Sequence, residues 1–297
     1  MATRRPPTSD HLGFLAIDKS GGMTSHDVVA RVRRLAGMRK VGHAGTLDPM
    51  ATGLLVVALG PATRLLRYVQ ADAKEYVAEV CFGVATDSLD ADGTEVSRSP
   101  MAVTRDGLAD ALDAFVGEID QVPPMVSAIK QDGVRLHELA RQGIEVDREP
   151  RRVTIHHIRL LGFEPGEYPT ATLEVGCGSG TYIRTLADDI ARSLGGRAHL
   201  TALRRTAIGP IGVDSAVTLE ALAERGVAAV LRSPADALAG MASVEVDEAG
   251  AERVAHGRPL DREVSADRVA VLDPVGRLLA VYRADGPRIV AETVLPT

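Results

Sequence analysis

Residues 42–53 read Gly42-His43-Ala44-Gly45-Thr46-Leu47-Asp48-Pro49-Met50-Ala51-Thr52-Gly53. The two glycines at the start allow tight turns and the close approach of a ligand, and Pro49 restricts Asp48 to an extended conformation. Such a loop can present one carboxylate rigidly. Alternatively, Asp48 caps a helix that starts at Pro49, because Asp before Pro is common at helix N-termini. The residues alone leave both interpretations open.

Regular elements are predicted on both sides of this loop. Thr24 or Ser25 can cap a helix with apolar positions at helical spacing, and Gly37 suits its end. Short runs of apolar residues, or of apolar residues alternating with polar ones, predict strands. A second stretch with helical spacing follows the glycine-rich turn at 178–180. The strands are expected at 54–59, 76–84 and 171–177, and the helices at 104–116 and from Tyr182 to Leu194.

The last sixty residues differ from the rest. After the break at Ser233-Pro234, short strands are predicted at 243–246, 269–272, 278–282 and 289–294, separated by Gly, Pro and Asp. This pattern indicates a small β-rich appendage from residue 236 to residue 297. Residues 131–152 are polar and charged, which predicts an excursion from the core.

Composition fits one large domain plus a small one, since 297 residues with 45% hydrophobic content can build a sizeable core. If its charge were spread evenly, a net charge of -6 would argue weakly against nucleic-acid binding. However, residues 1–70 hold ten Lys or Arg and only four Asp or Glu. This local basic group suits phosphate contacts, although a solvated helix face explains it equally well. Its members include Arg31, Arg33, Arg34, Arg39, Lys40 and Arg64.

Several classes of site are not supported. Cys81 and Cys177 are far apart in sequence and form no zinc or disulfide pattern, which fits a reducing cytoplasm. Neither a signal peptide nor a membrane span is expected. Phosphate-loop, dinucleotide, hydrolase-elbow and zincin motifs do not occur. The adjacent His156 and His157 would point to opposite faces of a strand, so we expect no metal and no cofactor.

The stretch 42–53 resembles the signature of bacterial tRNA pseudouridine-55 synthases, the TruB family. The likeness extends from residue 14 to about residue 210 and is much looser afterwards. It is carried by 19–25 (Lys19-Ser20-Gly21-Gly22-Met23-Thr24-Ser25), 74–76 (Lys74-Glu75-Tyr76), 86–93, 123–130, 180–189 and 198–205. Ser20, Val126 and His137 depart from the family pattern, which has proline, an aromatic residue and tyrosine there.

The resemblance implies an α+β pseudouridine synthase fold with a mixed, mainly antiparallel sheet flanked by helices. Residues 10–235 would form the catalytic domain, with 131–152 as an RNA-gripping loop, and 236–297 a small PUA-like domain. The implied activity is the isomerisation of uridine 55 in the TΨC loop of tRNA by base flipping, without a cofactor. A cytoplasmic monomer that binds tRNA and no membrane is expected.

The resemblance also implies site residues. Asp48 is the catalytic carboxylate, Arg184 its ion-pair partner, and Tyr182 lines the pocket and can move a proton from carbon. Tyr76 stacks on the flipped base, Leu203 closes the pocket and His43 fills the gap left by the nucleotide. Ordinary core tyrosines and a loop histidine bonded to backbone are the alternatives. Further substrate contacts are expected from Lys19, Arg64, Asp90 and Lys130.

Two rival functions remain at this point. A non-catalytic RNA-binding or tRNA-folding module could grip a flipped base in the same pocket. A nucleosidase-like hydrolase could use the same carboxylate on the same glycosidic bond.

Overall fold

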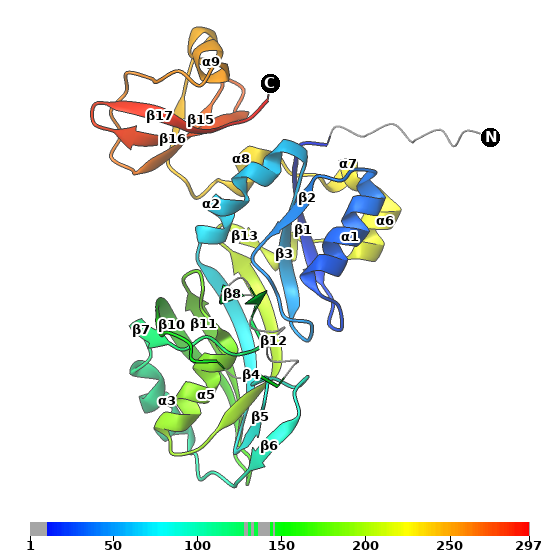
Figure 1. Ribbon diagram of the computed structural model, residues 1–297, viewed down its shortest axis with the longest axis vertical. Coiled ribbons are helices and arrows are strands. Elements are labelled where there is room, and N and C mark those ends of the chain that lie inside the picture. Colours follow the sequence, from blue (N-terminus) through cyan, green and yellow to red (C-terminus); the bar gives the residue numbers. More distant parts are fainter. Residues whose placement is uncertain (1–10, 128–129, 132–133, 136–142, 145, 297) are drawn as a thin grey trace, which may run out of the picture. The chain divides into compact units, whose positions relative to one another are not determined.

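The computed structural model describes residues 11–127, 130–131, 134–135, 143–144 and 146–296 (Figure 1). The chain forms two compact units. Unit 1 contains Met1–Pro49, Gly53–Asp72 and Ala207–Thr297, and unit 2 contains Met50–Thr52 and Ala73–Thr206.

Unit 1 begins with an antiparallel arrangement around one apolar strand. Strand β3 (Thr52–Leu59) pairs with β1 (Gly13–Lys19) on one edge and with β2 (Val41–Ala44) on the other. Residues 54–59 are fully buried, as the continuous apolar run predicts. Helix α1 (Ser25–Ala36) has Thr24 as its cap, whose Oγ1 accepts a hydrogen bond from the Asp27 N–H, and it ends at Gly37 in the left-handed conformation.

Short helices follow in the same unit. They are η1 (Gly60–Leu65), α2 (Leu66–Ala71), η2 (Val213–Ser215), α6 (Leu219–Arg225), α7 (Val227–Val230) and α8 (Pro234–Ala237), with strand β13 (Ile211–Gly212) among them.

The C-terminal sheet buries both of its faces. It consists of β14 (Ser243–Glu245), β15 (Arg268–Leu272), β16 (Leu278–Asp285) and β17 (Arg288–Val294), in that order, with α9 (Glu248–Ala255) beside it. Alternate residues such as Ala270 and Val281 share a cluster with Phe14. The residues that point to the opposite face, such as Val271 and Tyr282, belong to a second cluster with residues of α9. The predicted β-rich C-terminal region is confirmed.

Unit 2 is built on a five-strand path. Its strands lie in the order β12 (Ala198–Ile208), β4 (Lys74–Phe82), β11 (Thr170–Cys177), β10 (Arg151–Glu164) and β7 (Gly117–Gln121). Two hairpins form separate two-stranded sheets, β5 (Val84–Thr86) with β6 (Glu95–Arg98), and β8 (Lys130–Gln131) with β9 (Val134–Arg135).

Helices cover one face of this path. Helix α3 (Arg105–Asp113) and helix α5 (Ile183–Ser193) contact each other, and they contact β10 and β4 respectively (Figure 1). Along β4, Tyr76, Ala78 and Val80 are buried while Glu75 and Glu79 are more exposed. The alternation follows the two-residue period of a strand with one covered face.

The predicted α+β class is confirmed. The sheet pairings are mainly antiparallel, with β14 and β15 parallel. Cys81 and Cys177 are free thiols. Among the described residues, no helix is both long and apolar enough to cross a membrane. Much of the predicted RNA-gripping loop, including His137, lies outside the described residues.

Candidate active site

Asp48 lies in the connection between β2 and β3, and both of its chain neighbours are held by hydrogen bonds. The buried Ser25 hydroxyl accepts from the Leu47 N–H at 2.9 Å and lies 3.2 Å from the Leu47 carbonyl, to which it can donate. The Pro49 carbonyl accepts from the Gly22 N–H at 3.0 Å. Gly45 has φ +81°, a conformation that favours glycine and turns the chain after β2. The loop therefore presents a half-buried carboxylate from a fixed backbone.

The helix-cap interpretation of Asp48 is wrong. Residues 49 and 50 form a bend, and the chain enters strand β3 at Thr52, so no helix begins at Pro49. Pro49 restricts the preceding residue without starting a helix.

Lys19 supports this loop from inside the unit. Its side chain is 0% exposed, and its ammonium group donates to the carbonyls of Met23 (2.8 Å), Ser20 (3.0 Å) and Pro49 (3.2 Å). A buried ammonium needs such partners, because desolvation without them is expensive. In this structure Lys19 holds the backbone beside Asp48 and is buried, and its contact with substrate stays a prediction.

His43 lies on β2, just ahead of the same loop. Its ring meets the ring of the exposed His26 edge to face, with centroids 5.6 Å apart and planes at 83°. His43 is half-buried, so it remains reachable from solvent.

The basic residues of unit 1 gather at the end of α1. Arg33, Arg34 and Arg39 line a hollow of about 580 Å³, although Arg33 also donates to the Val41 carbonyl at 2.9 Å. The exposed Arg64 donates to the Val294 carbonyl at 3.2 Å and lines a second hollow with Lys40. Exposed guanidinium groups around a hollow suit phosphate oxygens.

In unit 2, Arg184 and Asp90 form a buried pair. Their side chains are 2% and 5% exposed, and Nη1 lies 3.3 Å from a carboxylate oxygen. Arg184 also donates to the carbonyls of Ser88 (2.6 Å) and Val126 (2.9 Å). It occupies the first turn of α5, where the helix dipole disfavours a cation, and these acceptors offset that effect.

Asp90 is itself fully engaged in a turn. Its carboxylate accepts from the Ser88 hydroxyl at 2.6 Å and the Asp92 N–H at 3.1 Å. Next to it, Leu89 has φ +63°, a conformation rare outside glycine that costs about 1–3 kcal/mol and persists only where the surroundings enforce it. The structure therefore places Asp90 as a support of Arg184, away from solvent.

The predicted pocket residues of unit 2 lie on three elements. Tyr76 (7% exposed) is on β4 opposite Val175, and Leu203 (6% exposed) is on β12. Tyr182 precedes α5, where its N–H donates to the Gln121 side-chain oxygen at 2.7 Å and its carbonyl accepts from the Gln121 amide at 3.0 Å. The amide of Gln121, which is 1% exposed, thus fixes the start of α5.

Sequence reasoning missed Gln121 and the role of Ser25. Gln121 is 61 residues from Tyr182, so no local pattern signals the contact. Ser25 was a candidate cap, and its polar side chain directly after the true cap Thr24 was the available signal. Lys130 belongs to β8, and its side chain lies outside the described residues.

These groups belong to two separate units. Asp48 and His43 lie in unit 1, while Tyr76, Tyr182 and Arg184 lie in unit 2. Their meeting in one pocket, and the ion pair of Asp48 with Arg184, stay predictions. Each unit provides positioned groups: a carboxylate on a fixed loop in unit 1, and in unit 2 a buried guanidinium two residues after Tyr182, whose backbone Gln121 holds.

Family models match almost all of the chain. The N-terminal domain of TruB family pseudouridylate synthase matches residues 33–183. The C-terminal domain of tRNA pseudouridylate synthase B matches residues 184–237, and the C-terminal model of tRNA pseudouridine synthase II matches residues 241–296.

Curated relatives and solved structures agree with these matches. The tRNA pseudouridine synthase B of Syntrophotalea carbinolica is 49% identical over 86% of this chain and 84% of the relative. That of Symbiobacterium thermophilum is 52% identical over 82% of each. Among solved structures, a Cbf5-Nop10-Gar1 complex superposes with a TM-score of 0.77 at 26% identity, covering 97% of this chain and 86% of that one.

The first family model alone spans more than half of the sequence, and the relatives cover most of both chains. The resemblance is confirmed: this chain belongs to the TruB family of pseudouridylate synthases.

Proposed function

We propose that this chain isomerises uridine 55 in the TΨC loop of tRNA to pseudouridine. Membership of the family and relatives named tRNA pseudouridine synthase B support the activity. The observation that carries the proposal is the fixed presentation of Asp48, because Ser25 holds the residue before it and Gly22 and Lys19 hold the residue after it.

The reaction needs no redox partner. The N1–C1′ bond of uridine breaks, the uracil turns, and a C5–C1′ bond forms. C5 then loses a proton and N1 gains one, so that substrate and product are isomers. A carboxylate can act as the nucleophile or stabilise a cationic sugar during such glycosidic cleavage. Asp48 takes this role in the proposal.

The groups of unit 2 complete the reaction centre. Arg184 pairs with Asp48 and favours its ionised form, since an opposite charge offsets desolvation. The buried pair with Asp90 supports this role, because it holds the guanidinium in place. Tyr182 faces the base and moves the proton from C5.

The target base must leave the RNA stack to reach these groups. Tyr76 stacks on the extruded uracil, which is worth about 1–3 kcal/mol. Leu203 closes the pocket, and His43 occupies the space that the nucleotide leaves. Asp90 contributes through Arg184, and Lys19 through the loop.

RNA outside the pocket is held by positive charge. The hollow lined by Arg34 and Arg39 and the exposed Arg64 support phosphate contacts by unit 1. Lys130 and the segment 131–152 grip the TΨC stem-loop, and residues 236–297 serve as a PUA-like RNA-binding domain beside a catalytic domain of residues 10–235. The enzyme acts as a monomer in the cytoplasm.

Tritium release tests the activity. A tRNA transcript labelled at C5 of uridine is incubated with the purified chain, and the expected result is one released tritium per tRNA and a pseudouridine at position 55. A transcript with cytidine at position 55 serves as the substrate control and is expected to release none.

The variants Asp48→Asn and Asp113→Asn form a matched pair, because Asp113 is an exposed carboxylate in α3. Only the first is expected to abolish release. Binding without release by the unmodified chain would favour the RNA-folding module, and free uracil among the products would favour the hydrolase. Release from the control transcript would show a target other than uridine 55.

A further inference from the structure

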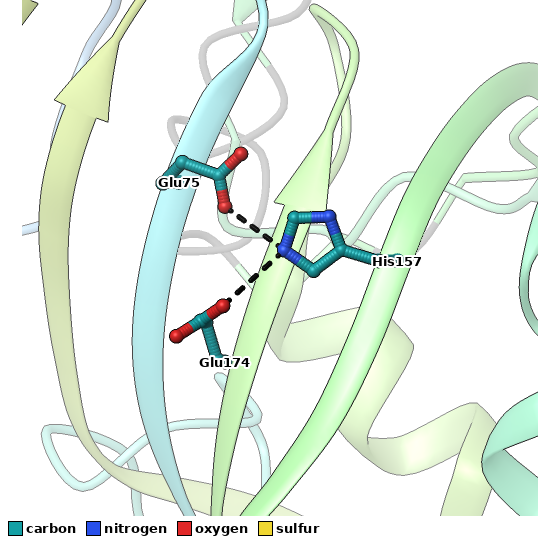
Figure 2. A group of neighbouring side chains, drawn as sticks. All are labelled: Glu75, His157 and Glu174. Carbon is teal, nitrogen blue, oxygen red and sulfur yellow. Dashed lines mark ion pairs between the residues drawn. The ribbon is translucent and has the colours of Figure 1, made fainter.

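Three side chains from three neighbouring strands converge on the more exposed face of the unit 2 sheet (Figure 2). They are Glu75 on β4, Glu174 on β11 and His157 on β10. The His157 Nε2 atom lies 3.2 Å from a Glu75 oxygen and 3.4 Å from a Glu174 oxygen. The three ligand atoms all lie within 4.8 Å of one another.

Two backbone features create this convergence. A bulge between Ile155 and His157 inserts one extra residue into β10, so that His157 pairs with Gly176 on the same face as the glutamates. Gly176 also pairs with Glu75 on its other side. A Cβ at position 176 would lie only 2.3 Å from the imidazole and 2.8 Å from the Glu75 carboxylate, so glycine leaves the room in which the two side chains meet.

The two nitrogen–oxygen distances fit a tetrahedral metal ion. Imidazole and carboxylate ligands bind Zn²⁺ at about 2.0–2.2 Å, which places two ligand atoms about 3.3–3.6 Å apart. The buried Nε2 makes no hydrogen bond of acceptable geometry within the part of the chain that the structure describes, despite its two close oxygens. An ion between the ring nitrogen and the oxygens would satisfy all three groups.

We propose that Glu75, His157 and Glu174 form a binding site for one Zn²⁺ ion, which clips strands β4, β11 and β10 together. Imidazole with two carboxylates suits Zn²⁺ better than Ca²⁺ or Mg²⁺, which prefer oxygen alone. The glutamates are about one-third exposed, so water can supply the fourth ligand.

Charge around the site favours a cation. Arg159 contributes one positive charge and lies 2.6 Å from the same Glu174 oxygen that approaches His157. The two carboxylates exceed it by one negative charge when the imidazole is neutral. Arg159 is 65% exposed and can swing away, so it competes weakly with the ion.

The position of the clip gives it a structural role. Glu75 lies between Lys74 and Tyr76, whose side chains are buried on the opposite face of β4. An ion bound to Glu75 would therefore stiffen the strand that carries Tyr76 without touching the face on which Tyr76 lies. Binding to the folded state alone would raise the melting temperature.

Zn²⁺ titration into the tag-free, metal-stripped full chain tests the proposal by calorimetry and thermal denaturation. One ion per chain and a melting temperature that rises with Zn²⁺ are expected. Co²⁺ in place of Zn²⁺ is expected to give the visible absorption of a four-coordinate ion. Glu75→Gln and His157→Gln should lose the site, while the neighbours His156→Gln and Glu79→Gln, both exposed, should retain it.

Gly176→Ala gives the sharpest variant, because it removes no ligand. The added methyl group should separate the imidazole from Glu75 and weaken Zn²⁺ binding by about 10- to 100-fold, the range seen when ligands lose their orientation. If Gly176→Ala does not fold, the Zn²⁺ affinity of His157→Gln tests the proposal instead. The His157 side chain is partly exposed, so this substitution should leave the fold intact. No stoichiometric Zn²⁺ binding, or equal binding by His157→Gln and His156→Gln, would overturn the proposal.

Discussion

Asp48 and Asp90 differ in exposure and in the bonds that surround them. Asp90 is 4% exposed, and its own carboxylate bonds to Ser88, Asp92 and Arg184. Around Asp48 the described bonds fix the backbone of Leu47 and Pro49, the residues on either side, and the carboxylate is half-buried. The bonds of Asp90 fix its carboxylate directly, and the bonds of Leu47 and Pro49 fix the backbone from which Asp48 extends.

The difference predicts opposite responses to the same substitution. Asp48→Asn is expected to lower the rate of pseudouridine formation by about 10⁴-fold or more, as loss of a nucleophile does in other enzymes. The free energy of unfolding should fall less than in Asp90→Asn, because the hydrogen bonds that hold the backbone of Leu47 and Pro49 remain. Single-turnover kinetics and urea denaturation measure the two quantities. A large loss of stability would place Asp48 in the same class as Asp90.

Asp90→Asn should act first on stability. It removes the negative charge of Asp90 from its buried pair with Arg184, and breaking a buried ion pair costs about 3–5 kcal/mol. Urea denaturation measures this loss. The exposed pair Arg283–Asp285 is the control, and Arg283→Gln should leave the unfolding midpoint unchanged. If Asp90→Asn and the control variant unfolded at the same urea concentration, Asp90 would not be a structural carboxylate, and its contrast with Asp48 would be lost.

Ser25→Ala tests whether the neighbours of Asp48 position it. The substitution leaves both backbone groups of the buried Leu47 without the hydroxyl, at a cost of about 1–3 kcal/mol. A displaced carboxylate should also lower the rate by up to about 100-fold. Ser20→Ala, at an exposed position nearby, should change neither rate nor stability. An unchanged rate in Ser25→Ala would show that the loop positions itself.

Asp188 and Asp189 are a second pair of carboxylates with different surroundings, and they predict that the stability of the fold depends on pH. Asp188 bonds to Arg192 and Arg197, whereas burial and the Asp188 charge raise the pKa of Asp189 to about 6. The native state therefore binds this proton more tightly than the unfolded state does, and stability falls as pH rises from about 4 to about 6. Asp189→Asn should raise stability at pH 7 by about 1 kcal/mol, allowing for partial exposure.

Thermal denaturation across pH 4 to 7 checks this last prediction, with the range taken from the raised pKa. The variant should show a flatter profile than the unmodified chain. An unchanged profile in the variant would show that the pKa of Asp189 is not raised in the folded state.

Local patterns predicted the elements whose signals are contained in one stretch of chain. The apolar run of β3, the capped helix α1, the start of α5 and the four C-terminal strands were all placed to within a few residues. The rigidity of the Asp48 loop followed from its glycines and Pro49. The family resemblance, and not the spacing, supplied the roles of Tyr76, Tyr182 and Arg184.

Contacts between distant residues were beyond the reach of such patterns. The clamp of Gln121 on Tyr182 and the pairing of Arg184 with Asp90 depend on strand order and register, which the sequence does not display locally. The bulge in β10 is a further case, because strict alternation assigns His157 to the wrong face. One inserted residue was enough to hide the cluster with Glu75 and Glu174.

One face of the C-terminal sheet belongs to the same apolar cluster as Phe14 and Leu54, and the other face belongs to a cluster with α9. Arg67 ties the same region to helix α2 through Thr293 and Glu292. In evolutionary terms, this region is a poor candidate for exchange between proteins as a separate cassette. Any graft that replaced it would have to supply apolar side chains that complete the cluster with β1 and β3.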